Sequence, residues 1–218
     1  MNQSSSLWSD AWRRLLANKA AVAGGLVLLI FILLAIFAPW IAPHSYSYQN
    51  LELGASPPSS DFLLGTDTLG RDLFSRILYG ARVSLMVGFV ATGVALIIGV
   101  SWGIIAGYFG GKIDSVMMRI VDVLYGLPFI IFIILLMVIF GRNIWLLFGA
   151  IGAVEWLTMA RIVRGQVLTI KNQEYVLAAQ AMGVSNIQMF RKHIFPNILG
   201  PIAVYATLTI PQVMLLEA

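Results

Sequence analysis

Cysteine is absent from the chain, and charged residues are scarce. With no thiol among 218 residues, the protein can form neither disulfide bonds nor thiolate metal sites. Its two histidines, His44 and His193, lie far apart in the sequence, so they do not predict a metal centre, and we expect no cofactor. Charged residues make up 11% of the chain, well below the share typical of a water-soluble domain. The composition therefore argues against a water-soluble protein.

Apolar residues dominate instead. They make up 59% of the chain and give it a mean hydropathy of +0.87. They fall into long runs, five of which reach the roughly 20 residues that a helix needs to cross ~30 Å of hydrocarbon. The sequence therefore predicts an all-α, polytopic helical membrane protein, with spans at Ala20–Ala42, Val83–Tyr108, Val123–Phe140, Ile144–Ala160 and Ile198–Leu216.

The predicted segments alternate between the two sides of a membrane. Basic residues indicate the orientation, because with the N-terminus inside, ten of the 14 Lys and Arg residues lie on the cytoplasmic side. The expected order is a cytoplasmic N-terminal segment (1–19), the first span (20–42), an external loop with an interfacial helix (43–82), spans two to four (83–160), a cytoplasmic loop (161–197) and the fifth span (198–218).

Glycine and proline predict how the spans pack. Gly99, Gly103 and Gly107 recur at every fourth position of the second span, which would let another backbone approach closely; packing within the chain is preferred over packing against another subunit. Pro128 and Pro211 should kink the third and fifth spans, because each removes a backbone donor. Between residues 64 and 76, charged and apolar positions have helical spacing, which predicts a surface helix entering the second span.

The loop between the fourth and fifth spans carries the strongest local signals. Asn172 is placed to cap a helix over residues 173–182, and Gly183 supplies a left-handed stop. A second helix then starts from Ser185 through the spacing of a capping box, and it should end before Pro196. The sequence thus predicts a helix, a glycine turn and a second helix on the cytoplasmic side.

This loop resembles the cytoplasmic coupling loop of ATP-binding-cassette importer permeases, whose pattern is Glu-Ala-Ala, three residues, Gly and, about a dozen positions later, Leu-Pro. Ala178, Ala179, Gly183 and Pro196 fit that pattern, whereas Leu177 and Phe195 replace the family's Glu and Leu. The chain also resembles the dipeptide, oligopeptide and nickel transport permeases, most closely the second (C-type) oligopeptide subunit. That resemblance rests on Gly65-Thr66-Asp67, Gly70-Arg71-Asp72, Ser75-Arg76, Ala81-Arg82-Val83-Ser84-Leu85, Gly107-Tyr108, Asp114, Met118-Arg119, Ala160-Arg161-Ile162-Val163-Arg164-Gly165-Gln166 and His193-Ile194-Phe195-Pro196-Asn197.

The resemblance implies a type I importer transmembrane-domain fold in the inner membrane of a bacterium. Family members have six spans, so this chain, with about five, is expected to be truncated before the sixth. A complex is implied, with a second permease as heterodimer partner, two cytoplasmic ATPase subunits, an external peptide-binding protein and surrounding membrane lipid. The chain would be a peptide-transport subunit and not an enzyme. The residues implied to couple it to an ATPase are Glu174, Tyr175, Ala178, Ala179, Gly183 and Phe195.

Catalytic and nucleic-acid functions fit the residues less well. Gly99-Val100-Ser101-Trp102-Gly103 matches the Gly-x-Ser-x-Gly elbow of serine hydrolases, but it lies inside an apolar helical run with no base nearby in sequence. The Gly-x-x-x-x-Gly-Lys-Ser/Thr phosphate loop is absent from the sequence. The residues around Gly183 resemble a DNA-binding helix-turn-helix, but the second helix is tethered to a span and would reach a major groove poorly. The net charge of +4 fits contact with anionic lipid better than with nucleic acid.

A secondary transporter or a structural membrane subunit without ATPase partners is the remaining alternative. A secondary transporter would place ionisable groups at mid-membrane to couple transport to an ion. Glu155 is the candidate pathway residue within a predicted span, six residues and roughly 9 Å along the helix from Arg161.

Overall fold

The structure is a computed structural model that describes residues 7–141 and 143–217. Within these residues it is helical, with no strand and a single isolated bridge between Thr66 and Asp72. The prediction of an all-α protein is therefore confirmed. The chain divides into two compact units, Met1–Leu85 and Met86–Ala218, which are described separately. The helices are α1 (Leu7–Ala17), α2 (Lys19–Ile36), α3 (Ala38–Ile41), α4 (Leu73–Ala95), α5 (Ser101–Phe109), α6 (Gly111–Tyr125), α7 (Phe129–Phe140), α8 (Ile144–Lys171), α9 (Glu174–Ala181), α10 (Asn186–Met189) and α11 (Phe195–Glu217).

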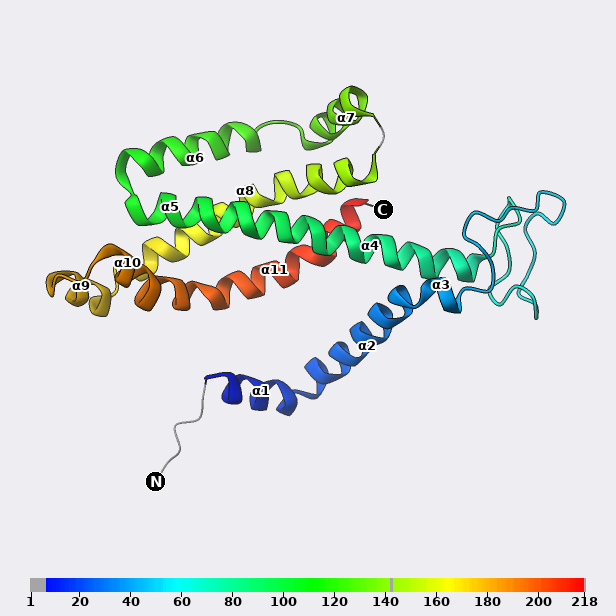
Figure 1. The fold of residues 1–218 in the computed structure, drawn as a ribbon, viewed down its shortest axis with the longest axis horizontal. Helices are drawn as coiled ribbons and strands as arrows, with labels where there is room; N and C mark the ends of the chain where they lie inside the picture. The colour runs from blue at the N-terminus through cyan, green and yellow to red at the C-terminus, as the bar shows by residue number, and fades with distance from the viewer. Residues whose placement is uncertain (1–6, 142, 218) are drawn as a thin grey trace. The chain divides into compact units, whose positions relative to one another are not determined.

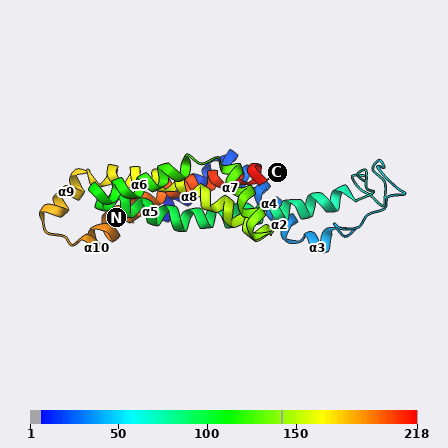
Figure 2. The same cartoon turned by 90° about the horizontal axis from the view of Figure 1, so that it is seen from above.

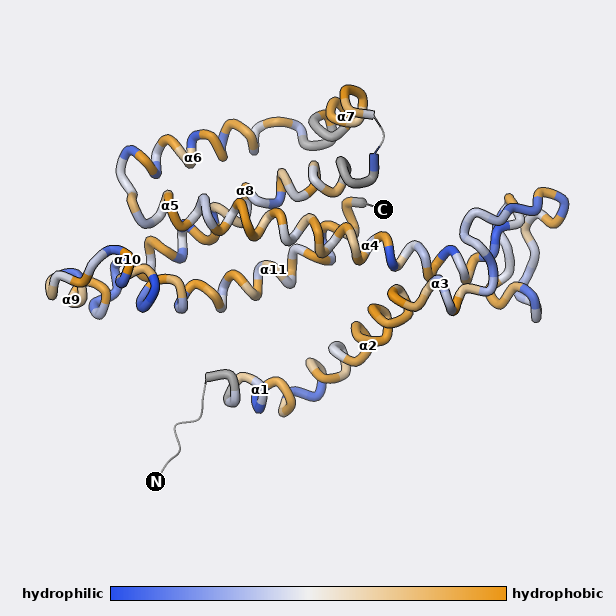
Figure 3. Tube along the Cα trace, in the orientation of Figure 1, coloured by the Kyte–Doolittle hydropathy of each residue, from blue (hydrophilic) through white to orange (hydrophobic). Residues whose placement is uncertain are grey.

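The first unit contains α1 to α3, a long loop and the start of α4. Asn18 caps α2 by accepting a hydrogen bond from the Ala21 backbone N–H, 3.2 Å away. Beyond its first residue, α2 has no charged side chain, and Figure 3 shows it as hydrophobic along most of its length. The predicted first span is interrupted near its end, because Pro39 restarts the chain as the short helix α3.

The second unit is built on three long helical segments. A π-helical turn, Leu96–Val100, joins α4 to α5 without a break, and α5 and α11 both pack against α8 (Figures 1 and 2). A buried apolar cluster joins α8, α9 and α11, and partly buried residues of the α4–α5 segment cover it. Its members from the long helices are Met159, Val163, Val167, Ile170, Ile198 and Ile202.

The glycine stripe, with its four-residue spacing, lies where the π-helical turn Leu96–Val100 and α5 contact α8. Its three members are buried against α8: Gly99, Gly103 and Gly107. A methyl group on Gly103 would lie 2.5 Å from the carbonyl oxygen of Ala160, a distance that backbone atoms do not tolerate. The prediction that the stripe packs within the chain is therefore confirmed.

The predicted spans are only partly continuous helices. Among the described residues, three helical segments are long and apolar enough to cross a membrane: Lys19–Ile36, Leu73–Phe109 and Asn186–Leu216. The predicted third span is wrong as a single helix, because α6 ends at Tyr125 and α7 begins only at Phe129. Pro128 explains the break, since it disfavours helical backbone in the residue before it. The fourth predicted span continues as α8 to Lys171.

Candidate functional site

The α9–α10 unit, residues 173–194, is a compact helix, turn and helix. Its turn is as predicted: Gly183 has a φ of +77°, and the Ser185 side chain accepts a hydrogen bond from the Gln188 backbone N–H. The predicted cap at Asn172 is wrong, because Gln173 occupies the cap position and makes no side-chain capping bond. The left-handed glycine thus sets the angle between the two helices.

The second helix of the unit continues into the last long helix. The predicted end before Pro196 is wrong, because a π-helical turn, Phe190–Ile194, leads directly into α11. Pro196 lies just after this turn, whose wider geometry accommodates the ring within the continuous helix. The α9–α10 unit is therefore connected rigidly to α11.

One face of the unit is buried against the long helices. Val176 and Ala179 of α9, together with Met189 and Ile194, belong to the same apolar cluster as the α8 and α11 side chains. Each of these four residues is at most 3% exposed. A movement of the unit must therefore be passed on to α8 and α11 through a close-packed core.

Polar contacts tie the same unit to the end of α5. The Tyr108 hydroxyl donates to the Asn186 side-chain oxygen at 2.8 Å, 78 residues away in the sequence. Lys171, the last residue of α8, donates from its Nζ to the Tyr108 backbone oxygen at 2.7 Å and lies 5.7 Å from the centre of the Tyr108 ring. Tyr108 thus joins α5, α8 and α10. The sequence motif containing Tyr108 was noted, but its distant partners could not be read from it.

The predicted coupling residues divide into two groups. The exposed residues of the unit are Glu174, Tyr175, Ala178 and Gly183, and Phe195, at the start of α11, is exposed as well. Ala179 is buried, so it can position α9 but cannot itself contact a partner. The unit also exposes three apolar side chains that the prediction missed: Leu177, Met182 and Ile187. They could have been found as apolar residues at positions outside the buried face.

Two ion pairs connect α6 to α8. Arg164 donates to both oxygens of Asp114, with Nη2 2.6 Å from Oδ2, and Arg161 donates to Asp122 at 2.8 Å. The hydrogen bonds that Arg164 donates to Asp114 raise the pKa of Arg164 further above its usual value. Asp114, Arg161 and Arg164 belong to motifs that the sequence had singled out. The pairs fix α6 against α8.

Glu155 lies at a cavity between three helical segments. The cavity has a volume of about 340 Å³ and is walled by α8, Gln212 of α11 and residues at and after the end of α6, including Tyr125. Glu155 itself is 8% exposed. Among the described residues, no group of three His, Cys, Asp or Glu side chains is close enough to hold a metal ion.

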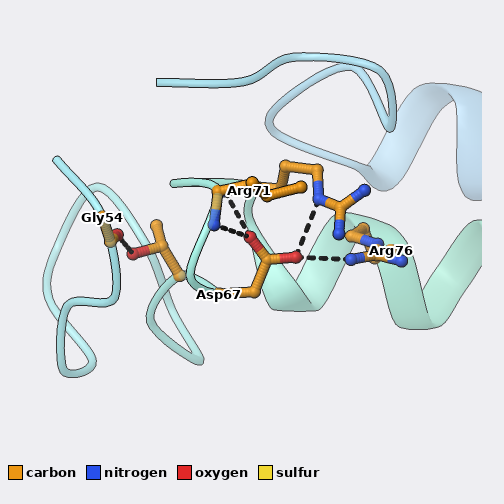
Figure 4. Close-up of polar contacts among 6 residues, drawn as sticks. Gly54, Asp67, Arg71 and Arg76 are labelled. Carbon is orange, nitrogen blue, oxygen red and sulfur yellow. Dashed lines mark hydrogen bonds and ion pairs between the residues drawn. The ribbon is translucent and has the colours of Figure 1, made fainter. Parts of the chain in front are cut away.

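The loop of residues 43–72 in the first unit is ordered by carboxylates (Figure 4). Asp67 accepts hydrogen bonds from the backbone N–H groups of Leu69 and Arg71 and from the side chains of Arg71 and Arg76. Burial would raise the pKa of Asp67, but these bonds outweigh it and lower the pKa to about 2. The predicted helix over residues 64–76 is therefore wrong for its first part, because Asp67 closes a turn there.

The helix begins only where a second carboxylate caps it. Asp72 accepts hydrogen bonds from both the backbone N–H and the hydroxyl of Ser75, and α4 starts at Leu73. Thr66 adds another tie, because its hydroxyl donates to the Gly54 carbonyl at 2.7 Å. The motifs Gly65-Thr66-Asp67 and Gly70-Arg71-Asp72 are thus turn-forming and capping elements.

Comparison with known proteins gives consistent results over the whole chain. Residues 99–218 match the family described as binding-protein-dependent transport system inner membrane component, and residues 6–58 match the N-terminal transmembrane domain of oligopeptide transport permease C. The dipeptide transport system permease protein DppC of Bacillus subtilis is 49% identical over 213 residues, which cover 98% of this chain and 67% of the relative.

Oligopeptide permeases are similar to the same extent. The oligopeptide transport system permease protein OppC of Bacillus subtilis is 46% identical, with 99% of this chain and 71% of the relative covered. OppC of Escherichia coli K12 is 47% identical, with 98% and 71% covered. The similarity therefore extends over both compact units.

Proposed function

The chain belongs to the family of binding-protein-dependent transport system inner membrane components, and from this premise we propose that it is the membrane-spanning permease subunit of an ATP-driven importer of dipeptides or oligopeptides. It is a multi-pass protein of the bacterial inner membrane. The observation that carries the proposal is the α9–α10 unit: a helix–glycine–helix element that exposes apolar side chains, packs against α8 and α11 and is hydrogen-bonded to α5.

The exposed side of the α9–α10 unit would be the contact with an ATPase subunit. Tyr175, Met182 and Ile187 leave large apolar surfaces uncovered, which an aqueous loop would not favour unless a partner buries them. Because the opposite face is packed into the core of α8 and α11, closure of an ATPase pair around this unit would move those helices as rigid bodies. Glu174, Ala178 and Phe195 would border the contact, and Ala179 and Gly183 would hold its shape.

ATP hydrolysis would take place in separate subunits. The family is described as dependent on a binding protein, which supports a complex with an external peptide-binding protein, a second permease and two cytoplasmic ATPases. The excess of Lys and Arg on one predicted side supports a cytoplasmic N-terminus. The α9–α10 unit would then face the cytoplasm and the 43–72 loop the outside.

Crosslinking within the assembled complex would test the coupling contact. The chain has no cysteine, so a single introduced cysteine reports one position. We expect Ile187→Cys, which replaces a 74% exposed side chain, to crosslink to an ATPase subunit. Ser115→Cys, exposed at the start of α6, is the control and should crosslink much less. Peptide uptake by the same complexes in proteoliposomes, with ATP inside or outside, measures the transport itself.

Two results would contradict the proposal. If no ATPase co-purifies in mild detergent and uptake does not depend on ATP, a secondary transporter or a structural subunit becomes the better explanation. If a cysteine at residue 180 reacts with an impermeant reagent in intact cells, the proposed orientation is wrong.

A further inference from the structure

Among the described residues, Glu155 is a buried carboxylate with no ion-pair partner. It lies on α8 with 8% of its surface exposed. Among the hydrogen bonds and ion pairs of the described residues, none involves Glu155, whereas Asp67, Asp72, Asp114 and Asp122 all have partners. A buried carboxylate without a partner is costly, so a group from outside this chain is expected to meet it.

The two arginines of α8 are engaged elsewhere. Arg161 is six residues along α8, roughly 9 Å away, and its guanidinium is bonded to Asp122 and lies over the ring of Tyr125. Arg164 is bonded to Asp114 by two hydrogen bonds. Neither arginine can neutralise Glu155 without giving up its own partner.

The cavity in front of Glu155 has the size and lining of a small polar-headed ligand site. Its volume of about 340 Å³ is at the lower end of the roughly 300–1,000 Å³ usual for ligand sites. The polar residues that line it are Glu155, Thr158 and Gln212, and Leu124, Leu127 and Leu157 provide an apolar wall. Tyr205 is close enough to interact with Glu155 and to hydrogen-bond with Thr158. A group with several N–H donors and a small apolar neighbour fits this combination.

We propose that this cavity binds the free α-amino group of a peptide in transit, with the Glu155 carboxylate as the counterion and Thr158 and Gln212 as neutral acceptors. The inference rests on the proposed peptide import. An α-ammonium group carries three N–H donors, and with a pKa of about 8 it is charged at neutral pH. The side chain of the first residue lies against the leucines. The site recognises the end of the peptide that all unblocked peptides share, so it tolerates varied sequences.

The test compares a blocked and an unblocked peptide in the complete transporter. Complexes with wild-type or Glu155→Gln permease are reconstituted with their ATPases and binding protein, and uptake of trialanine and of N-acetyl-trialanine is measured. Glu155→Gln keeps the side-chain shape and removes the charge. We expect uptake of trialanine to fall at least about tenfold, as for loss of a charged hydrogen bond, and the small uptake of the acetylated peptide to stay unchanged. Using the same binding protein throughout cancels its own preference.

A labelling experiment reads the site directly and does not require the acetylated peptide to be transported. Thr158→Cys is labelled in the assembled complex, with Ser115→Cys as the control outside the cavity. Trialanine should slow the labelling of Thr158→Cys severalfold, N-acetyl-trialanine should not, and Glu155→Gln should abolish the protection. Labelling of Ser115→Cys should be insensitive to both peptides.

Three outcomes would overturn the site. If Glu155→Gln lowers uptake of both peptides equally and protection persists, Glu155 does not recognise the amino group. If the variant no longer co-purifies with the second permease, its counterion belongs to that subunit. If neither uptake nor protection changes, the carboxylate has no role in binding. A wild-type complex that recruits no ATPase and imports no peptide would instead contradict the proposed function, and the labelling experiment would still decide whether the cavity binds an amine.

Discussion

The 43–72 loop and the α9–α10 unit are both non-membrane segments, and they are held in opposite ways. In the loop, hydrogen bonds to Asp67 and Asp72 determine the backbone, and large apolar side chains such as Leu51 and Leu63 are exposed. In the α9–α10 unit, Met189 and Ile194 are buried in an apolar cluster shared with the long helices. The loop thus depends on charge and the unit on packed volume.

This difference matches what each segment is proposed to do. A unit that transmits force must not deform, and a close-packed apolar core resists deformation. The loop is held by hydrogen bonds from backbone and side-chain groups to single carboxylates, so removing one charge should release one turn without disturbing a packed core. Perturbing volume should therefore affect the α9–α10 unit, and perturbing charge should affect the 43–72 loop.

Removing a buried side chain should have the largest effect. Met189 is 1% exposed, so Met189→Ala leaves a cavity and should lower the free energy of opening of the α9–α10 unit by about 2–5 kcal/mol. Amide hydrogen exchange of α9 measures this opening. Ile187→Ala, on the exposed side of the same helix, is the control and should change the opening free energy by less than about 0.5 kcal/mol. An equal loss of exchange protection in the 43–72 loop would contradict the view that only the α9–α10 unit depends on packed volume.

A backbone change at Gly183 should have the next largest effect. The space around its missing side chain is open, so Gly183→Val acts through backbone strain at φ +77°, about 1–2 kcal/mol, and not through a clash. The subunit should still be expressed, while peptide uptake falls and ATP hydrolysis no longer follows it. Uptake and ATPase rate are measured on complexes with matched subunit amounts.

Asparagine provides the matched control at this position. It adopts the left-handed region more readily than valine, so Gly183→Asn should retain most of the coupling. Normal transport by Gly183→Val would contradict the view that the turn angle matters.

Loss of the Tyr108 hydroxyl should have a smaller effect. Tyr108→Phe removes the bonds to Asn186 but keeps the ring beside Lys171, so the unit should be destabilised by about 0.5–1.5 kcal/mol. A double-mutant cycle with Asn186→Ala isolates the pair, again read by hydrogen exchange of α10. Additive effects of the two substitutions would show that the hydrogen bond contributes nothing to holding the unit.

Acidification should have the smallest effect, and it should be seen in the turn of the 43–72 loop that Asp67 closes. Because the pKa of Asp67 is lowered from 3.8 to about 2, its carboxylate stabilises the turn fully above pH 4, and this contribution is lost as the pH falls through about 2. The amides of Leu69 and Arg71 should lose exchange protection over that range. Asp67→Asn should remove this pH dependence, and the buried amides of α9 should not show it. Equal acid sensitivity of the α9 amides would contradict the view that only the loop depends on charge.

The sequence predicted features that depend on neighbouring residues. The apolar helices, the glycine turn at Gly183 and the cap at Ser185 are all confirmed, because each is encoded within a few positions. The glycine stripe also predicted its packing within the chain correctly. The coupling role of the exposed residues and the number of five spans stay predictions.

Features that depend on distant contacts were missed. The hydrogen bond from Tyr108 to Asn186 joins residues 78 positions apart, and no local sequence pattern predicts it. The turn at Asp67 was read as helix, because charged and apolar residues happen to have helical spacing while the carboxylate bonds the backbone instead. At Pro196 the helix continued because a π-helical turn precedes the proline.

The π-helical turn at Leu96–Val100 has a consequence for the angular phase of the long helix around it. The buried positions of α4 and α5 follow one another at intervals of four residues, an interval that advances about 40° too far on a straight α-helix. Over five intervals the buried stripe would rotate by about 200° around the helix axis, so it would no longer face the helices packed against it. The extra residue in the π-helical turn resets this phase midway, so a one-residue deletion there would turn α5 by about 100° and direct its glycines away from α8. The positions concerned are Val87, Ala91, Ala95, Gly99, Gly103 and Gly107.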